Sequence, residues 1–449
     1  MHTERVETQL PWRAPTATGP LDAALRLPGS KSMTARALVL GANSAGATTL
    51  RGPLRNRDTE LMAAGLRAMG CHVSTADDGL WLLRSRPLQG PARVDVGLAG
   101  TVLRFLPPLA TLAEGAVAFD GHPRSRRRPM APLLGALRTL GARVEPGGGL
   151  PFTVHGVGRI GGGPVTIDAS ASSQLVSGLL LSAPEFDRGL VLRHVGRPVP
   201  KPQVDLTVHM LRSAGAGVDD SRPDVWSVEP GRLKGRAWEI EPDLGSAAPF
   251  LAAALVTGGS VTVQRWPPAT SQPARRLLDL LHRMGGEARL TPRGLVMRGT
   301  GKVRGLSASL AGVAEFAPVL AALAAVADSP SHLYGLGPAW RDETADGQDG
   351  QEGLARLAGA LAALGADVTV EADGLRVRPR PLRGGTLPTH GDRHLAHAGA
   401  VLGLTVAGVD LDDVACTAKT VPDFPRLWST MVFGYEGGSA DAEARVRRG

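Results

Sequence analysis

One pattern recurs five times along this chain and limits its possible folds more than any other feature. Each copy runs from a helix end into an alternating stretch with turn residues at its centre, over residues 66–83, 137–154, 211–228, 281–297 and 361–377. Glycine takes the left-handed conformation of a helix C-terminus without strain. It stands where each helix is expected to end, at Gly70, Gly141, Gly215, Gly285 and Gly365. The alternation that follows predicts a β-hairpin in every copy.

A second pattern precedes the first: a strand, a polar loop, an Ala- and Leu-rich helix and another strand. It is clearest over residues 94–119, 165–186 and 238–263, and further copies begin near Leu25, Ser307 and Leu387. The chain therefore contains six copies of a βαβαββ-type unit, the last with a shortened tail, which predicts an α/β fold. Helices that are apolar on all sides are expected to be buried.

The 449 residues exceed what one hydrophobic core usually organises, so we expect two domains of three units each. The opening strand of the first unit and the missing tail of the last suggest that the N-terminal strand completes the C-terminal domain. One domain would span 28–239, and the other would combine 1–27 with 240–449. Polar loops at helix N-termini around one cleft between the domains would concentrate positive dipole there, which favours an anionic ligand.

The composition argues against several other classes of protein. No run of about eighteen apolar residues indicates a membrane span, and the first residues lack the basic-then-apolar order of a signal peptide. Cys71 and Cys416 give neither a disulfide framework nor a metal-ligand spacing, so we expect a cytoplasmic protein without a metal site. A net charge of +8 carried by scattered Arg residues favours small acidic ligands over nucleic acid.

The stretch LPGSKSMTARAL at 27–38 is a candidate anion site. A nucleotide-binding P-loop has Gly directly before the Lys and another Gly five positions earlier. Here those positions hold Ser30 and Leu25, so the stretch is not a P-loop. A helix start with Lys31 and Arg36 beside it still offers N–H groups and positive charge to an anion.

Four segments, together with the six repeats, carry a resemblance to one enzyme family. They are LPGSKSMTARAL (27–38), GLAGTVLRF (97–105), DASASSQL (168–175) and CTAKTVPDFPRLW (416–428). The chain resembles the 5-enolpyruvylshikimate-3-phosphate synthase family, in its actinobacterial form, over nearly its whole length. The resemblance implies the two-domain enolpyruvyl transferase fold with an active-site cleft between the domains, in a protein that is usually monomeric. It also implies transfer of the enolpyruvyl group of phosphoenolpyruvate to the 5-hydroxyl of shikimate 3-phosphate, without metal or cofactor.

The resemblance implies roles for individual residues as well. Lys31 would contact both substrates, Glu315 would take the 5-hydroxyl proton, and Lys419 would lie at phosphoenolpyruvate. The implied catalytic set is Lys31, Glu315, Glu343, Asp392 and Lys419. The implied substrate-binding set is Ser32, Arg36, Gly100, Thr101, Arg124, Ser172, Ser173, Gln174, Arg341, Arg393 and His394.

Within the substrate-binding set, the resemblance assigns Ser32 and Arg36 to the shikimate carboxylate, which a guanidinium matches through paired hydrogen bonds. It assigns Arg124 to phosphoenolpyruvate. The triplet 172–174 would hold the 3-phosphate and the ring.

The fifth unit, WRDETADGQDGQEGLARL at 340–357, departs from the family pattern. Arg341, Glu343 and Thr344 match it, while Asp342 replaces a Lys or His. Gly353 replaces an Arg that clamps phosphoenolpyruvate, although Arg356 follows one turn later.

Two further departures concern the third and sixth units. Arg393 and His394 follow Asp392 in exchanged order, and adjacent helical positions point about 100° apart. Pro200, which has neither a hydroxyl nor an N–H, replaces a phosphate-binding Ser.

The departures weaken contacts to both phosphate-bearing groups, and each hydrogen bond to a charged group contributes about 1.5–3 kcal/mol. The sequence therefore favours a diverged paralogue that eliminates water from a shikimate-type ring in secondary metabolism, using the acid–base groups of the catalytic set. The alternative is an active synthase of aromatic amino-acid biosynthesis in which Arg356, Arg393 and Lys201 compensate. A non-catalytic ligand-binding protein is the third hypothesis, and a nucleic-acid-binding protein is a distant fourth.

Overall fold

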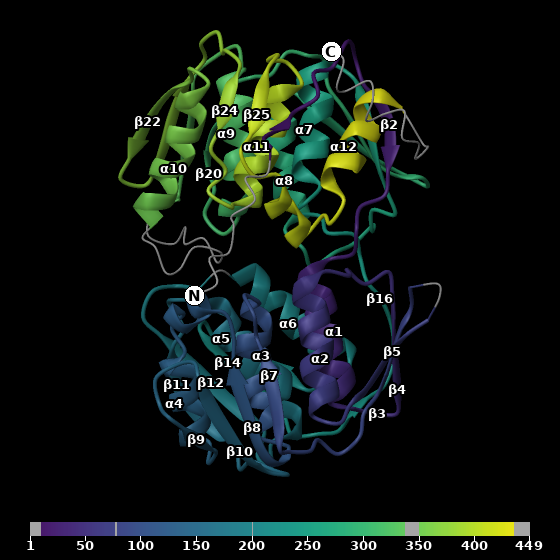
Figure 1. The fold of residues 1–449 in the computed structure, drawn as a ribbon, viewed down its shortest axis with the longest axis vertical. Helices are drawn as coiled ribbons and strands as arrows, with labels where there is room; N and C mark the ends of the chain where they lie inside the picture. Colours follow the sequence, from purple (N-terminus) through teal and green to yellow (C-terminus); the bar gives the residue numbers. More distant parts are fainter. Residues whose placement is uncertain (1–9, 77–78, 200, 337–349, 435–449) are drawn as a thin grey trace.

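The computed structural model describes residues 10–76, 79–199, 201–336 and 350–434. This part of the chain forms two halves, one above the other in Figure 1. Each half has its own hydrophobic core. Buried apolar side chains between Met33 and Ile240 form the core of the lower half, and those of 14–27 and 244–431 form the core of the upper half.

The second and third units, both in the lower half, show the repeat in full. The second unit consists of β7 (Ala92–Asp95), α3 (Gly100–Ala110), β8 (Glu114–Asp120), α4 (Ala131–Thr139), β9 (Arg143–Glu145) and β10 (Phe152–Val157). The third consists of β11 (Gly163–Asp168), α5 (Ser173–Ser182), β12 (Leu190–Val195), α6 (Lys201–Ser213), β13 (Val218–Asp219) and β14 (Val225–Val228). In each unit the first two strands are parallel and a hairpin extends the sheet in antiparallel fashion. The helix between the parallel strands supplies the crossover that parallel pairing requires.

The fifth and sixth units lie in the upper half. The fifth consists of β20 (Ser307–Ser309), α9 (Ala317–Ala325), β21 (Ser331–Tyr334), α10 (Gly350–Ala363), β22 (Asp367–Glu371) and β23 (Gly374–Arg378). The sixth is β24 (Gly385–Leu387), α11 (Arg393–Gly403), β25 (Val409–Leu411), the 3-10 turn η4 (Ala415–Lys419) and α12 (Phe424–Phe433). Up to Gly434, where the described residues end, this last unit has no hairpin, and β1 (Trp12–Arg13) pairs with β25 in its place.

The first and fourth units exchange their opening strands. The first contains α1 (Lys31–Ala42), β4 (Ala47–Arg51), α2 (Arg57–Ala68), β5 (His72–Thr75) and β6 (Trp81–Arg84). The fourth contains α7 (Ala248–Thr257), β17 (Ser260–Gln264), α8 (Ala274–Arg283), β18 (Glu287–Thr291) and β19 (Gly294–Arg298). β2 (Asp22–Leu25) precedes α1 but pairs with β17, and β16 (Ala237–Glu239) precedes α7 but pairs with β4. The chain therefore changes halves between each of these strands and the helix that follows it in the sequence.

The two segments that pass between the halves, 27–30 and 240–243, run side by side and are called the crossover segments below. Gly29 and Pro242 form an antiparallel bridge. The N–H of Asp243 also donates to the carbonyl of Pro28 at 2.9 Å. We propose these segments as the domain boundaries, with 28–239 as one domain and 1–27 plus 240–449 as the other.

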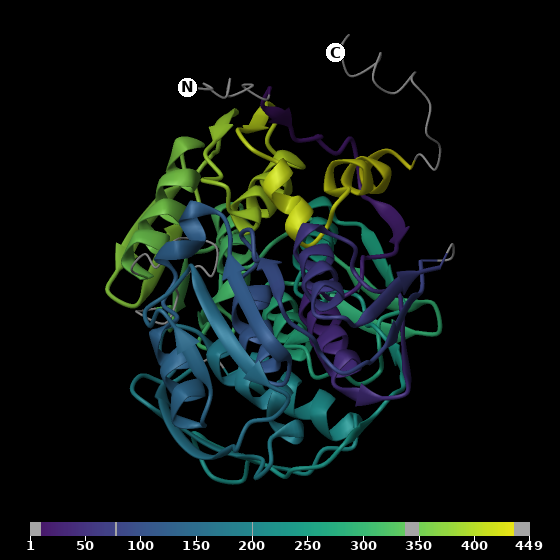
Figure 2. The ribbon, with the colours of Figure 1, turned by 60° about the horizontal axis from the view of Figure 1, so that its bottom comes forward.

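The first helix of each unit lies inside its half. α1, α3 and α5 pack against one another in the lower half, as α7, α9 and α11 do in the upper half. Figure 2 brings the lower half forward, and its three units, coloured from purple to teal, lie around these helices. The five glycines predicted at helix ends have φ angles between 90° and 105°, which confirms the predicted left-handed conformation. The burial expected for the apolar helices is also confirmed, since every residue of α9 is buried.

Candidate active site

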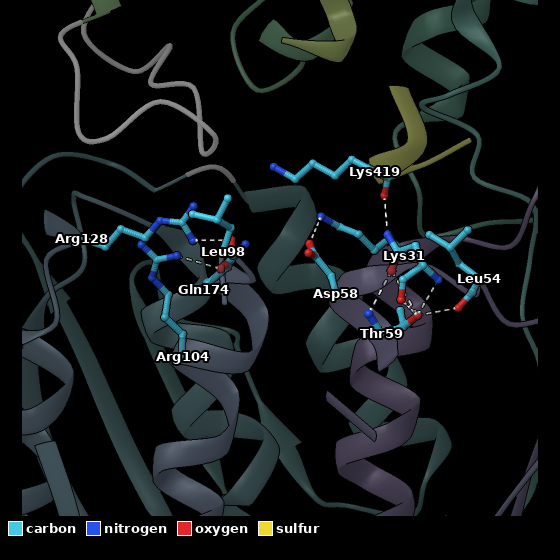
Figure 3. Close-up of polar contacts among 10 residues, drawn as sticks. Lys31, Leu54, Asp58, Thr59, Leu98, Arg104, Arg128, Gln174 and Lys419 are labelled. Atoms are coloured by element: carbon cyan, nitrogen blue, oxygen red, sulfur yellow. Dashed lines mark hydrogen bonds and ion pairs between the residues drawn. The ribbon is translucent and has the colours of Figure 1, made fainter. Parts of the chain in front are cut away.

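Residues from both halves meet where α1 begins. Lys31 is the first residue of α1, and its Nζ lies 3.2 Å from Oδ2 of Asp58 near the start of α2. Asn56, which caps α2, donates from Nδ2 to the backbone carbonyl of Lys419 at 2.6 Å. Figure 3 shows Lys31, Asp58 and Lys419 close together, with Lys419 coming from the upper half. The structure therefore brings together two of the predicted catalytic residues.

Asp58 was not singled out from the sequence, although it belongs to this group. Burial on its own raises the pKa of Asp58, but the charges of Lys31 and Lys419 outweigh that effect and the pKa ends below its ordinary value. The carboxylate is therefore ionised at neutral pH and balances one of the two lysine charges. The sequence signal that points to it is the helix start at 56–59, where Asn56 and Thr59 form a capping box around it.

A second group of cationic side chains surrounds Gly100, the first residue of α3. Arg104 Nη1 donates to Gln174 Oε1 at 3.0 Å, and Arg128 Nη1 donates to the carbonyl of Leu98 at 3.0 Å. Both guanidiniums are buried, with relative exposures of 6% and 9%. Figure 3 shows these side chains side by side above the helix ends. Two buried guanidiniums at a helix N-terminus are the arrangement that binds phosphate or carboxylate.

The structure brings Arg128, and not the predicted Arg124, to this group. Arg124 lies exposed on the 3-10 turn η1 (Pro123–Arg127), where its N–H donates to His122 Nδ1 at 3.2 Å. Ser125 is the buried residue of that turn and donates to the carbonyl of Gly97 at 2.6 Å. The backbone becomes extended at Arg128, which directs that side chain inward. In the Arg-rich run 123–129 the sequence alone gives no signal that separates these arginines.

Ser172, Ser173 and Gln174 lie at the start of α5. Ser172 is the residue before the helix, and its Oγ accepts a hydrogen bond from the N–H of Gln174 at 3.3 Å. Both serines are buried. The helix-capping role of Ser172 is thus visible, while binding of a substrate phosphate by the triplet stays a prediction. Thr101, in the first turn of α3, is likewise buried, and Ser32 in α1 is half-buried.

Arg36 has internal partners. It is 1% exposed and donates from Nε to Thr207 Oγ1 at 2.7 Å and from Nη2 to the carbonyl of Gln203 at 2.8 Å, both in α6. Nη1 donates to the carbonyl of Ser32 at 3.0 Å. Arg36 therefore holds α1 against α6, and its contact with a substrate carboxylate stays a prediction.

Replacing Arg36 with lysine is expected to lower the free energy of unfolding by about 2–3 kcal/mol. A lysine cannot reproduce the planar fork of donors, and buried acceptors left without a donor cost about 1–3 kcal/mol each. Chemical denaturation measures the change, with the exposed Arg13→Lys as control. An unchanged midpoint combined with a raised KM for the ring substrate would instead assign Arg36 mainly to substrate binding.

The start of α11 contributes the remaining described residues. Asp392 caps the helix, and its Oδ1 accepts from the N–H of His394 at 2.8 Å. Burial lowers the pKa of His394 well below its ordinary value, and the charges of Arg393, of His397 and of the two lysines lower it further. His394 is therefore neutral at pH 7 and lies near both lysines, while Arg393 carries the charge of the exchanged pair.

Glu315 lies in the 3-10 turn η3 (Ala314–Phe316) that leads into α9, and it is half-buried. Its Oε1 is close to Gly245, 3.5 Å from where a Cβ of that residue would be. Arg341, Glu343, Asp342, Thr344 and Pro200 lie outside the described residues. Arg356, suggested as a replacement clamp, forms an ion pair of 2.8 Å with Glu352 along α10.

Within residues 10–76, 79–199, 201–336 and 350–434, no group of three or more His, Cys, Asp or Glu side chains is placed to hold a metal ion. No helix of these residues is long and apolar enough to cross a membrane.

The fold is that of the two-domain enolpyruvyl transferases, as the repeats and the resemblance predicted. The EPSP synthase of Acinetobacter baumannii superimposes with a TM-score of 0.78 at 22% identity, covering 92% of this chain and 96% of that one. The enolpyruvyl transferase NikO of Streptomyces tendae superimposes with a TM-score of 0.72 at 19% identity, covering 93% and 96%. At these identities the likeness concerns the fold.

Sequence comparison is more specific than the structural comparison, because it identifies the family. The profile of EPSP synthase (3-phosphoshikimate 1-carboxyvinyltransferase) matches residues 15–428. The 3-phosphoshikimate 1-carboxyvinyltransferase of Mycobacterium ulcerans (strain Agy99) is 47% identical over 435 residues, which cover 95% of this chain and 99% of that protein. The chain therefore belongs to the EPSP synthase family.

Proposed function

We propose that this chain is an active 3-phosphoshikimate 1-carboxyvinyltransferase, which joins the enolpyruvyl group of phosphoenolpyruvate to the 5-hydroxyl of shikimate 3-phosphate. The observation that carries the proposal is the 47% identity, over 95% of the chain, with the Mycobacterium ulcerans protein of that name. The geometry supports it, because both substrates are anions and cationic side chains from both halves meet at the start of α1.

The group around Gly100 is the best candidate for the anion of phosphoenolpyruvate. Arg104 and Arg128 offer paired donors there, and Gln174 is held beside them by its hydrogen bond to Arg104. Because Gly100 has no side chain, an anion can approach the N–H groups at the start of α3.

The reaction forms a C–O bond at the 5-hydroxyl oxygen and breaks the C–O bond to phosphate, so that inorganic phosphate leaves and the hydroxyl gives up its proton. We assign Glu315 as the base that accepts this proton. Lys31 and Lys419, one from each half, would stabilise the charge on the phosphate as it leaves. Asp392 and Glu343 remain further acid–base candidates.

The dehydrating paralogue, which the sequence favoured, has less support than the synthase. It rested on altered residues at 342, 353, 200 and 393–394, of which 342 and 200 lie outside the described residues. The family membership and the high identity support the transferase. Nothing in the part of the chain that the structure describes favours elimination of water.

Proton NMR of the purified protein with shikimate 3-phosphate and phosphoenolpyruvate tests the proposal. New enolpyruvyl methylene signals, accompanied by release of inorganic phosphate only when both substrates are present, are the expected result. New ring-olefin signals from shikimate alone would show the dehydratase instead. Binding without any turnover would show a ligand-binding protein and would overturn the proposal.

Two neighbouring arginines provide a matched test of the phosphoenolpyruvate site. We expect Arg128→Ala to lower kcat/KM for phosphoenolpyruvate by a factor of about 10²–10³, the usual effect of losing one charge-stabilising donor. Arg124→Ala, in the same basic run but exposed, should change it by less than about twofold, as surface substitutions usually do. Steady-state kinetics at saturating shikimate 3-phosphate measures both variants. The reverse order would place Arg124 at the substrate.

A further inference from the structure

Glu241 lies on the second crossover segment, and both its backbone and its side chain are engaged. Its carbonyl accepts a hydrogen bond of 2.8 Å from the N–H of Ser30, the residue before Lys31. Its Oε2 accepts from Thr270 Oγ1 at 2.6 Å and from Gln272 Nε2 at 2.7 Å. One residue therefore connects the start of α1 to the loop 265–273, which joins β17 and α8 in the upper half.

Both the nitrogen and the oxygen of the Gln272 side-chain amide form hydrogen bonds. Its Nε2 also donates to the carbonyl of Pro242 at 3.0 Å, and its Oε1 accepts from the N–H of Leu244 at 3.0 Å. The same nitrogen lies 3.9 Å from Sδ of Met33. Met33 is buried in the first turn of α1 and belongs to the core of the lower half. Gln272 thus clamps the crossover segment and also reaches the other half.

The first turn of α1 contains Lys31, so the position of this turn affects the candidate active site. Lys31 and Asp58 belong to the lower half, while Lys419 belongs to the upper half. The seating of the first turn of α1 against the upper half therefore determines how the two lysines stand relative to each other. A displacement of about 1 Å in such a group can cost about 10²-fold in rate.

We propose that Gln272 is a positioning residue, which fixes the first turn of α1, and with it Lys31, against the upper half. The inference rests on the proposed function, since it requires Lys31 to act on the substrates. Without the amide, the Glu241 carboxylate keeps Thr270 as a donor, while Pro242 and Leu244 lose their partner. The side chain of Gln272 is not among the groups assigned to the substrates.

Two variants test the proposal. Gln272→Ala removes the clamp. Gln351→Ala is the matched control, because Gln351 Nε2 donates to the carbonyl of Ala372 at 2.7 Å elsewhere in the upper half.

We expect Gln272→Ala to lower kcat by about tenfold or more, with both KM values within about threefold of wild type, since misplacing a reacting group costs rate more than binding. The control should stay within about twofold of wild type. Wild-type kcat in Gln272→Ala, or an equal loss in the control, would overturn the proposal.

Amide hydrogen exchange gives a readout that does not depend on turnover. Exchange at residues 28–33 and 240–244 should be faster in Gln272→Ala than in wild type or Gln351→Ala, with the rest of the chain unchanged. Unchanged exchange at these residues would overturn the proposal. If the wild-type protein forms no product, the proposed function fails, and the exchange result by itself decides whether Gln272 holds the start of α1.

Discussion

Replacing Lys31 with methionine is expected to lower kcat/KM for the synthase reaction by a factor of about 10²–10³, the effect of removing one charged group that stabilises a transition state. Methionine keeps much of the length and packing of the side chain but removes the charge. Steady-state release of inorganic phosphate measures the change. The exposed Lys302→Met is the control and should remain within about twofold of wild type.

The same substitution affects stability through Asp58, and a double variant separates the two effects. Without Lys31, the buried carboxylate of Asp58 loses the largest charge that offsets its burial, so its pKa rises and the protein loses stability at neutral pH. Because the folded-state pKa of Asp58 is lowered in wild type, its contribution to stability is present above the unfolded pKa and is lost as the pH falls through the folded pKa. In Lys31→Met the folded-state pKa of Asp58 should be higher, so the contribution should be lost at a higher pH when the solution is acidified.

In Lys31→Met with Asp58→Asn the unpaired charge is gone, so we expect the unfolding temperature to recover while the activity stays low. Activity that returned together with stability would show that Lys31 is needed only for folding. Thermal unfolding followed by circular dichroism, alongside phosphate release, distinguishes these outcomes.

Replacing Gly100 with alanine is expected to raise KM for phosphoenolpyruvate by about tenfold or more, and KM for shikimate 3-phosphate by less, because only one of the three disturbed atoms is assigned to the ring. A Cβ at Gly100 would lie 2.8 Å from Arg104 Nη1, 3.2 Å from Arg128 Nη1 and 3.2 Å from Gln174 Oε1. The two guanidinium nitrogens belong to the group assigned to the phosphoenolpyruvate anion, and Gln174, which the resemblance assigns to the ring, is hydrogen-bonded to Arg104. Moving a charge-assisted contact by a few tenths of an ångström weakens several hydrogen bonds, each worth about 1.5–3 kcal/mol.

The matched control is Gly135→Ala in α4, where no atom lies within 4 Å of the added Cβ. Alanine is the better helix former by about 0.5–1 kcal/mol, and neither glycine has a positive φ, so both variants should fold. A KM for phosphoenolpyruvate that did not change in Gly100→Ala would place the anion elsewhere.

Local patterns in the sequence predicted much of the fold. The recurring helix-to-hairpin pattern yielded the α/β class, the six units and the glycines at the helix ends, because these features depend on residues close together in the chain. The pairing partners of the strands at 22–25 and 237–239 came from the structure. Strand pairing depends on which segments meet in space, and the chain changes halves directly after each of these strands.

In the candidate site, too, some residues were predicted from the sequence and others were found only in the structure. The motifs located Lys31, Gly100, Gln174 and Lys419, and the structure brings each of them to a group of interacting side chains. Arg104 does carry a signal in the sequence, because it is a charged residue within an otherwise uncharged helix. Asp58 and Arg128 emerged from the structure.

The sequence by itself determined the repeat number, the fold class and the family, since these follow from local periodicity and from motifs that are contiguous in the chain. Only the tertiary structure decided which arginine of the basic run turns inward, which carboxylate pairs with Lys31, and how Gln272 clamps the crossover segment. These contacts depend on distances of a few ångströms between residues far apart in the sequence, or on a local change of backbone direction. Neither can be predicted from the order of the residues alone.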